Sequence, residues 1–153
     1  MKIIELIDKN FVISNLSSKI KKDVLMEMVD CIVKKELDID GNELLRVLLE
    51  REELGSTGIG DGIAIPHGKV KKIKKLIVSF GRSLEGVDFQ SMDGKPTHII
   101  FLLIAPENSA GIHLKALARI SRLLKDSGFR KNLMEAQTSQ EIYDIIAQED
   151  EKY

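Results

Sequence analysis

The chain has 153 residues, of which 43% are hydrophobic and 31% are charged, with 23 basic against 24 acidic side chains. This length fits one domain with an ordinary hydrophobic core, so we treat residues 1–153 as a single domain, and the balanced charge argues against bulk affinity for nucleic acid. With one cysteine, no signal-peptide pattern and no apolar run long enough to cross a bilayer, we expect a cytoplasmic protein that does not insert into the membrane.

The first third of the chain predicts one short strand and two helices. Residues 11–13 are typical of a strand, and Ser17 or Ser18 then offers an N-cap for a helix. The apolar positions of that helix recur with a period of 3.6, at Val24, Leu25, Met28, Val29, Ile32 and Val33. A capping-box pattern at residues 40–43 predicts a second helix that runs up to Arg51.

The middle of the chain predicts a mixed sheet. Residues 63–65 and 76–80 are short apolar runs typical of strands. Residues 99–104 are apolar without interruption, which predicts a central strand with helices on each face. The turn at residues 92–96 contains Asp-Gly and favours a hairpin, so part of the sheet is expected to be antiparallel.

Helices dominate the C-terminal third. The spacing of His113, Leu117 and Ile120 predicts a helix whose core-facing side includes His113, in or near the first turn. A further helix is expected from about Phe129, and a capping box at residues 138–141 opens the last one. Helices before, between and after the strands predict an α/β fold (α+β by some schemes), a three-layer α/β/α sandwich with a central mixed β-sheet.

The segment from Gly55 to Lys69 carries the main functional signal. Its glycines let the backbone approach a ligand, their amides can form a nest for an anion, and the segment leads through Pro66 to His67. A neutral imidazole, with a reference pKa of about 6.5, is a nucleophile near pH 7, and its attack on phosphorus would give a phosphohistidine. The residues alone also allow a second interpretation, in which His67 is a strand-end histidine held by a backbone carbonyl.

Other site chemistries fit the sequence less well. Ser56 and Ser79 lack the G-x-S-x-G elbow of a serine hydrolase. His67, His98 and His113 show no short-range metal-ligand spacing, and the glycine-rich segment has neither a P-loop lysine nor a preceding strand. We therefore expect no metal, no cofactor and no nucleotide, and we assign His98 a structural role.

Arg51, the segment Gly55 to Gly68 and the pair His113-Leu114 at the start of a helix together resemble the type 2 IIA component of the bacterial sugar phosphotransferase system. This family includes the fructose and mannitol IIA domains and the nitrogen-regulatory IIA protein, and the resemblance covers nearly the whole chain. It implies that His67 accepts a phosphoryl group from the small phosphocarrier protein HPr. The group then passes to a cysteine of a IIB component, or its charge acts as a regulatory switch. The alternative is a non-catalytic regulatory protein that controls its partners without phosphoryl transfer.

The resemblance also implies roles for the neighbours of His67. Arg51 would steady the phosphoryl group, and His113 would contact His67 or the phosphoryl group without carrying it. The residues that match the loop around the site are Ser56, Thr57 and Gly58, with Asp61 added as a polar residue of open role. Without the resemblance, Arg51 is a solvated helix end and His113 a histidine at the edge of the core. The lysine-rich run 69–75 is expected to be solvated and outside the face that docks HPr.

Overall fold

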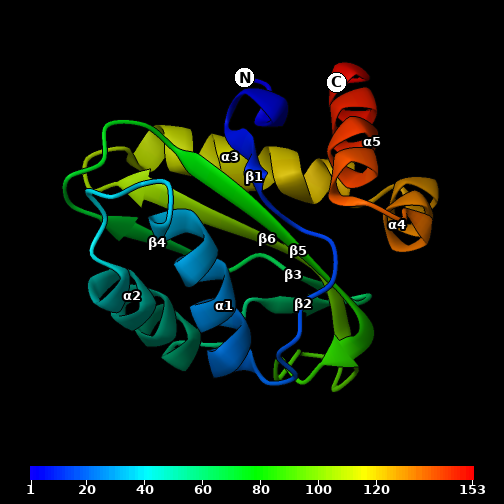
Figure 1. Cartoon of the computed structure of the whole chain (residues 1–153), viewed down its shortest axis with the longest axis horizontal. Helices are drawn as coiled ribbons and strands as arrows, with labels where there is room; N and C mark the ends of the chain where they lie inside the picture. Colours follow the sequence, from blue (N-terminus) through cyan, green and yellow to red (C-terminus); the bar gives the residue numbers. More distant parts are fainter.

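A six-stranded mixed sheet lies between two layers of helices in the computed structural model, which describes residues 1–153 apart from the side chain of Ala110 (Figure 1). Five strands follow the order β1 (Ile7–Ile13), β5 (Ile77–Val87), β6 (Thr97–Pro106), β3 (Ile63–Ala64) and β2 (Gly58–Gly60). The sixth, β4 (His67–Val70), pairs with β6 beyond β3. The predicted three-layer α/β/α arrangement is therefore confirmed.

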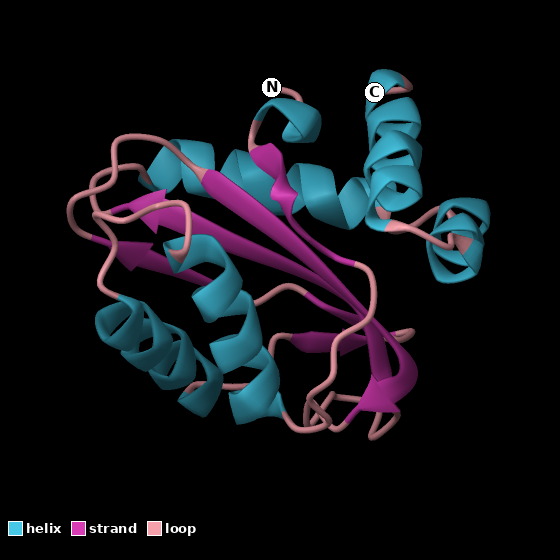
Figure 2. Cartoon of the chain, in the orientation of Figure 1, coloured by secondary structure: helices cyan, strands magenta, loops and turns pink.

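The helices divide between the two faces of the sheet (Figure 2). One face is covered by α1 (Lys21–Val33) and α2 (Gly41–Glu53). The other face is covered by α3 (Ala110–Leu123), α4 (Ser127–Glu135) and α5 (Ser139–Glu151), and a short 3-10 turn, η1 (Ile3–Glu5), precedes β1 on that side. Each face therefore has its own hydrophobic core.

Strand β6 confirms the expectation of a central strand buried on both faces. Phe101 and Leu103 join the core under α3, α4 and α5, whereas Leu102 and Ile104 join the core under α1 and α2. This alternation follows from the period of two along a strand. Strands β5 and β6 pair antiparallel, as the Asp-Gly turn between them predicted, and His113 lies in the first turn of the helix that follows β6.

The predicted serine cap of α1 is wrong. The helix begins at Lys21 after Ile20, whose extended backbone forms a bridge with Asp88 and offers no side-chain cap. The amides of Ser17 and Ser18 instead donate to the carboxylate of Glu27. Burial alone would raise the pKa of Glu27, but these hydrogen bonds lower it overall. A tertiary contact has replaced the local cap.

The sequence analysis predicts neither β2, which lies within the glycine-rich segment, nor β4, which joins the end of that segment to the lysine-rich run 69–75. β2 has only three residues, and two of them are glycines, so no side-chain alternation marks it. β4 is His-Gly-Lys-Val and has a single hydrophobic residue, Val70. The second of these omissions matters for function, because β4 carries His67.

Candidate functional site

Strand β4 sets the direction in which His67 points. His67 pairs with Leu103 and Lys69 with Ala105 in a parallel ladder along β6. Successive side chains of a strand point to opposite faces, so His67 and Lys69 share one face and Gly68 has the other. Gly68 lies against α2, where an added Cβ would come within 2.7 Å of Val47 Cγ1. His67 therefore points away from this contact, toward α3.

A hydrogen bond fixes the tautomer of His67. Its Nδ1 lies 2.9 Å from the carbonyl oxygen of Ile65. A carbonyl oxygen only accepts hydrogen bonds, so Nδ1 carries the proton and the lone pair lies on Nε2. This is the backbone-carbonyl contact of the second interpretation above, and it is also what a nucleophilic imidazole requires. The two interpretations therefore do not exclude each other.

His113 is the close neighbour of His67. The two rings meet edge to face, with centroids 5.3 Å apart and planes at 83°. His113 is only 6% exposed, and its Nδ1 has no hydrogen-bond partner among the described residues. Burial lowers the pKa of His113, and electrostatic interactions with His67 and Lys69 lower it further. His113 is therefore neutral near pH 7, with an unsatisfied polar atom beside the candidate nucleophile.

Arg51 reaches the same groove from the last turn of α2. Its Nη1 donates to the carbonyl oxygen of Gly55 at 2.9 Å. The groove has a volume of about 760 Å³ and is lined by residues of α2, β4 and α3, including Arg51, His67, Lys69, His113, Leu54 and Leu114. The structure thus brings together the three residues that the resemblance singles out. It also places Lys69 in this groove, whereas the sequence analysis expects the run 69–75 outside the face that docks HPr.

Exposed leucines flank the groove. Leu54, which directly follows α2, is 85% exposed, and Leu114 on α3 is 66% exposed. Side chains of this kind at the mouth of an open groove are typical of a surface that contacts another protein. No periodic pattern in the sequence marks these two leucines, because Leu54 follows the last residue of α2 and Leu114 lies on the exposed face of α3.

Residues 56–58 of the glycine-rich loop form hydrogen bonds with Glu52, with Phe89 and with one another. Thr57 donates to the buried carboxylate of Glu52 through both its amide and its hydroxyl group. Ser56 Oγ accepts from the amide of Gly58 and donates to the carbonyl of Phe89. These amides are occupied within the protein, so they do not form the anion nest that the glycines suggested. None of Ser56, Thr57 and Gly58 is among the residues that line the groove of His67.

Gly58 has a packing role in this loop. A Cβ at this position would lie 2.4 Å from Ser91 Oγ and 3.0 Å from Ser91 Cα. The chain therefore needs glycine here to let β2 approach the segment before β6.

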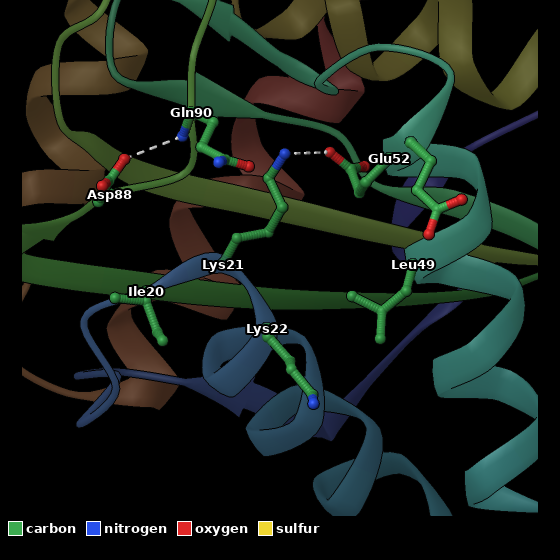
Figure 3. Close-up of a pocket in the computed structure, with 8 residues that line it drawn as sticks. Ile20, Lys21, Lys22, Leu49, Glu52, Asp88 and Gln90 are labelled. Atoms are coloured by element: carbon green, nitrogen blue, oxygen red, sulfur yellow. Dashed lines mark hydrogen bonds and ion pairs between the residues drawn. The ribbon is translucent and has the colours of Figure 1, made fainter.

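A cavity of about 490 Å³ is lined by residues that include Lys21, Glu52 and Gln90. Figure 3 shows the ion pair between Lys21 and Glu52 in the wall of this cavity.

Asp61 does not lie with the residues of the groove. Asp61 lies in the turn between β2 and β3 with a backbone φ of 56°, and its amide donates to the carboxylate of Asp93. Ile63, two residues later, pairs with Ile99 of β6, whereas His67 pairs with Leu103. Four positions along a strand span roughly 13 Å, so Asp61 lies at the far end of the sheet from His67. This position gives no support for a role of Asp61 in a phosphate-binding loop.

His98, which the sequence analysis also considered, is not among the residues that line the groove. His98 donates through Nδ1 to the carbonyl of Ser83, next to the start of β6. Across the part of the chain that the structure describes, no group of three His, Cys, Asp or Glu residues is arranged to hold a metal ion. No helix in that same part is long and apolar enough to cross a membrane.

Comparison with known proteins identifies the family. Residues 5–149 match the family described as "Phosphoenolpyruvate-dependent sugar phosphotransferase system, EIIA 2". The chain is 42% identical over 150 residues to the nitrogen regulatory protein of Bradyrhizobium diazoefficiens, covering 96% of this chain and 95% of that protein. It is 43% identical to the fructose-specific EIIABC component of Bacillus subtilis, covering 98% of this chain but only 24% of that longer protein.

A solved structure agrees with these relatives. The nitrogen regulatory protein IIA-Ntr of Neisseria meningitidis superposes with a TM-score of 0.87 at 32% identity, covering 94% of this chain and 98% of that one. Both a sugar-specific component and nitrogen regulatory proteins are thus among its relatives. The chain belongs to the type 2 EIIA family of the phosphoenolpyruvate-dependent sugar phosphotransferase system.

Proposed function

We propose that this chain is a phosphoryl carrier that accepts a phosphoryl group from phospho-HPr on Nε2 of His67. The observation that carries the proposal is the hydrogen bond from Nδ1 of His67 to the carbonyl of Ile65, which leaves the lone pair on the other ring nitrogen. That nitrogen belongs to a ring in a groove that also holds Arg51 and His113. A nucleophile with a fixed tautomer next to hydrogen-bond donors is the arrangement that phosphoryl transfer needs.

The proposed step is a displacement at phosphorus. The Nε2 lone pair of His67 forms the new P–N bond while the P–N bond of the phosphohistidine donor breaks, and the donor imidazole leaves with that electron pair. His67 becomes a phosphoimidazolium, and its Nδ1–H keeps the bond to Ile65, whose carbonyl dipole stabilises the positive ring. The Arg51 guanidinium offers a planar set of donors for the phosphoryl oxygens.

The character of the groove supports protein partners on both sides of the transfer. The exposed side chains of Leu54 and Leu114 offer apolar contact area beside His67, which a small phosphate ester would not use. HPr as donor and a IIB component, or a regulated protein, as recipient fit such an open surface. We place this exchange in the cytoplasm, without a nucleotide, a metal or a cofactor.

Two biological uses of the same chemistry follow from the relatives. The EIIABC name of the Bacillus relative joins an A part to B and C parts, which supports transfer from His67 to a IIB cysteine. The nitrogen regulatory relatives are matched over nearly their whole length, which supports a switch. In a switch, the phosphoryl group adds a charge of about −1.5 to −2 to the groove and changes which partner binds there.

The test is intact-mass measurement after incubation with phosphoenolpyruvate, enzyme I and HPr. We expect one acid-labile phosphoryl group on the wild type and none on His67→Ala. We expect His113→Ala to slow onward transfer more than acceptance. Acid-labile phosphate retained by His67→Ala would overturn the assignment of the acceptor. If the wild type takes up no phosphate, the chain instead binds its partners independently of phosphorylation.

A further inference from the structure

A buried carboxylate that the proposed chemistry does not use follows Arg51 in α2 and lies outside the groove lining. Glu52 is the penultimate residue of α2 and is only 8% exposed. Its carboxylate accepts hydrogen bonds from the amide and the hydroxyl group of Thr57 and forms an ion pair with Lys21 at 3.0 Å. A buried charge with this many partners holds its surroundings in one arrangement.

Lys21 extends this contact to two more segments of the chain. Its side chain is 11% exposed, compared with 4% for that of Glu52, and its ammonium group lies 5.0 Å from the centre of the Phe89 ring. It also donates to Ser56 Oγ, which donates in turn to the Phe89 carbonyl. The start of α1, the end of α2, the glycine-rich loop and the β5–β6 connection therefore meet at one ion pair, which Figure 3 shows from the cavity side.

The same loop holds Arg51. Successive residues of a helix point about 100° apart, so Glu52 can face the interior while Arg51 faces the groove. Arg51 donates to the Gly55 carbonyl, and the Gly55 amide donates to the carbonyl of Glu52. Both the helix end that carries Arg51 and the loop carbonyl that orients it are thus tied to Glu52.

We propose that Glu52 is a positioning residue for phosphoryl transfer, which fixes the Arg51 guanidinium relative to His67 through the loop 55–57. This proposal rests on the proposed phosphoryl-carrier function. Glu52 does not line the groove and contacts no reacting atom, so it acts through Arg51. Lys21 serves as its buried counter-ion and Thr57 as its hydrogen-bond partner.

The test is single-turnover transfer from phospho-HPr to Glu52→Gln over a range of phospho-HPr concentrations. We expect the maximal rate to fall about 10- to 100-fold, as a displacement of about 1 Å in a positioning group does. The half-saturating concentration of phospho-HPr should stay near that of the wild type, because the exposed leucines of the docking surface remain. Thr57→Val, which removes one hydrogen bond but keeps the ion pair, should show a smaller decrease, and it serves as the test variant if Glu52→Gln does not fold.

A double-mutant cycle with Arg51→Ala separates positioning from a general loss of structure. If Glu52 acts through Arg51, adding Glu52→Gln to Arg51→Ala should slow transfer by less than about twofold. Asp150→Asn is the matched control, because Asp150 is a fully buried carboxylate that pairs with Arg119, and neither residue lines the groove. At one temperature at which both proteins are fully folded, this control should transfer at the wild-type rate.

Three results would overturn the positioning role: wild-type transfer by the Glu52 and Thr57 variants, full additivity with Arg51→Ala, or equal slowing by Asp150→Asn. If the wild type accepts no phosphoryl group at all, it is the proposed function that fails. The NMR signals of the Arg51 side chain and the Gly55 amide then decide the positioning role. They should shift in Glu52→Gln and not in Asp150→Asn, and unchanged signals in Glu52→Gln would refute it.

Discussion

Replacing Gly68 by alanine tests how closely α2 must approach β4 for the groove to work. The new Cβ would lie 2.7 Å from Val47 Cγ1, whereas ordinary carbon contacts are about 3.5 to 4.0 Å. The shortfall is therefore about 1 Å, and it falls on a short β-branched side chain that cannot swing aside easily. Gly68 has no positive φ, so steric contact is the main cost of the substitution. Overpacking of this kind costs about 1 to 3 kcal/mol of unfolding free energy.

The same displacement should reach the chemistry. Relief of the clash moves α2 away from β4 by about 1 Å, and α2 carries Arg51 while β4 carries His67. A misplacement of that size in a positioning group costs about 100-fold in rate. We therefore expect Gly68→Ala to lose both stability and phosphoryl-transfer rate, although it removes no reacting group.

Urea unfolding and single-turnover transfer from phospho-HPr measure the two effects. Val47→Ala supplies the internal control, because it removes the atom that the new Cβ meets. Alone it should cost at most about 1.6 kcal/mol, from two methyl groups at about 0.8 kcal/mol each. The double variant Gly68→Ala/Val47→Ala should transfer faster than Gly68→Ala. The reasoning is refuted if Gly68→Ala matches the wild type in both assays, or if Val47→Ala fails to restore any of the lost rate.

Two further predictions concern stability. Asp40 caps α2 by accepting hydrogen bonds from the amides of Asn42 and Glu43, so Asp40→Ala should lower the unfolding free energy by about 1 kcal/mol. The control variant Asp38→Ala, at an exposed position nearby, should change it little. Equal losses of the two variants in urea unfolding would contradict the cap. The folded-state pKa of His113 is lowered by burial, so its stabilising contribution is present above the unfolded pKa of about 6.5 and is lost as the pH falls below it. His113→Gln should therefore lose less stability than the wild type between pH 7 and pH 5, and equal losses in urea midpoints would show that His113 is not the titrating group.

The elements predicted correctly are those whose signal is local. Helix α2 follows Asp40, whose own side chain caps it. Strand β6 is apolar on both faces because helices cover both faces of the sheet. The serine cap of α1 failed for a tertiary reason. Glu27, about ten residues away, binds the Ser17 and Ser18 amides, and Ile20 continues in an extended conformation against Asp88. Neither partner can be read from the residues around the serines.

The missed strands and the glycine nest share one cause. Strands β2 and β4 pair through backbone atoms and contain glycine where another chain segment comes close, so the alternation that reveals a strand is absent. The same glycines suggested an anion nest because sequence cannot tell which amides are already bonded. The structure directs the Thr57 amide to Glu52 and the Gly58 amide to Ser56.

This reassignment changes which groups must stabilise the proposed phosphoryl group. With the Thr57 and Gly58 amides occupied, the polar groups that share the groove with His67 are side chains, Arg51 from α2, His113 from α3 and Lys69 from β4. Three side chains on three separate elements keep their relative positions only while α2 and α3 stay packed on β4. The glycines at 58 and 68 permit the close contacts that packing needs, and Glu52 ties the end of α2 to the loop. The glycines near His67 could indicate this residue from the sequence. That its proposed chemistry depends on how α2 packs against β4 follows only from the three-dimensional contacts.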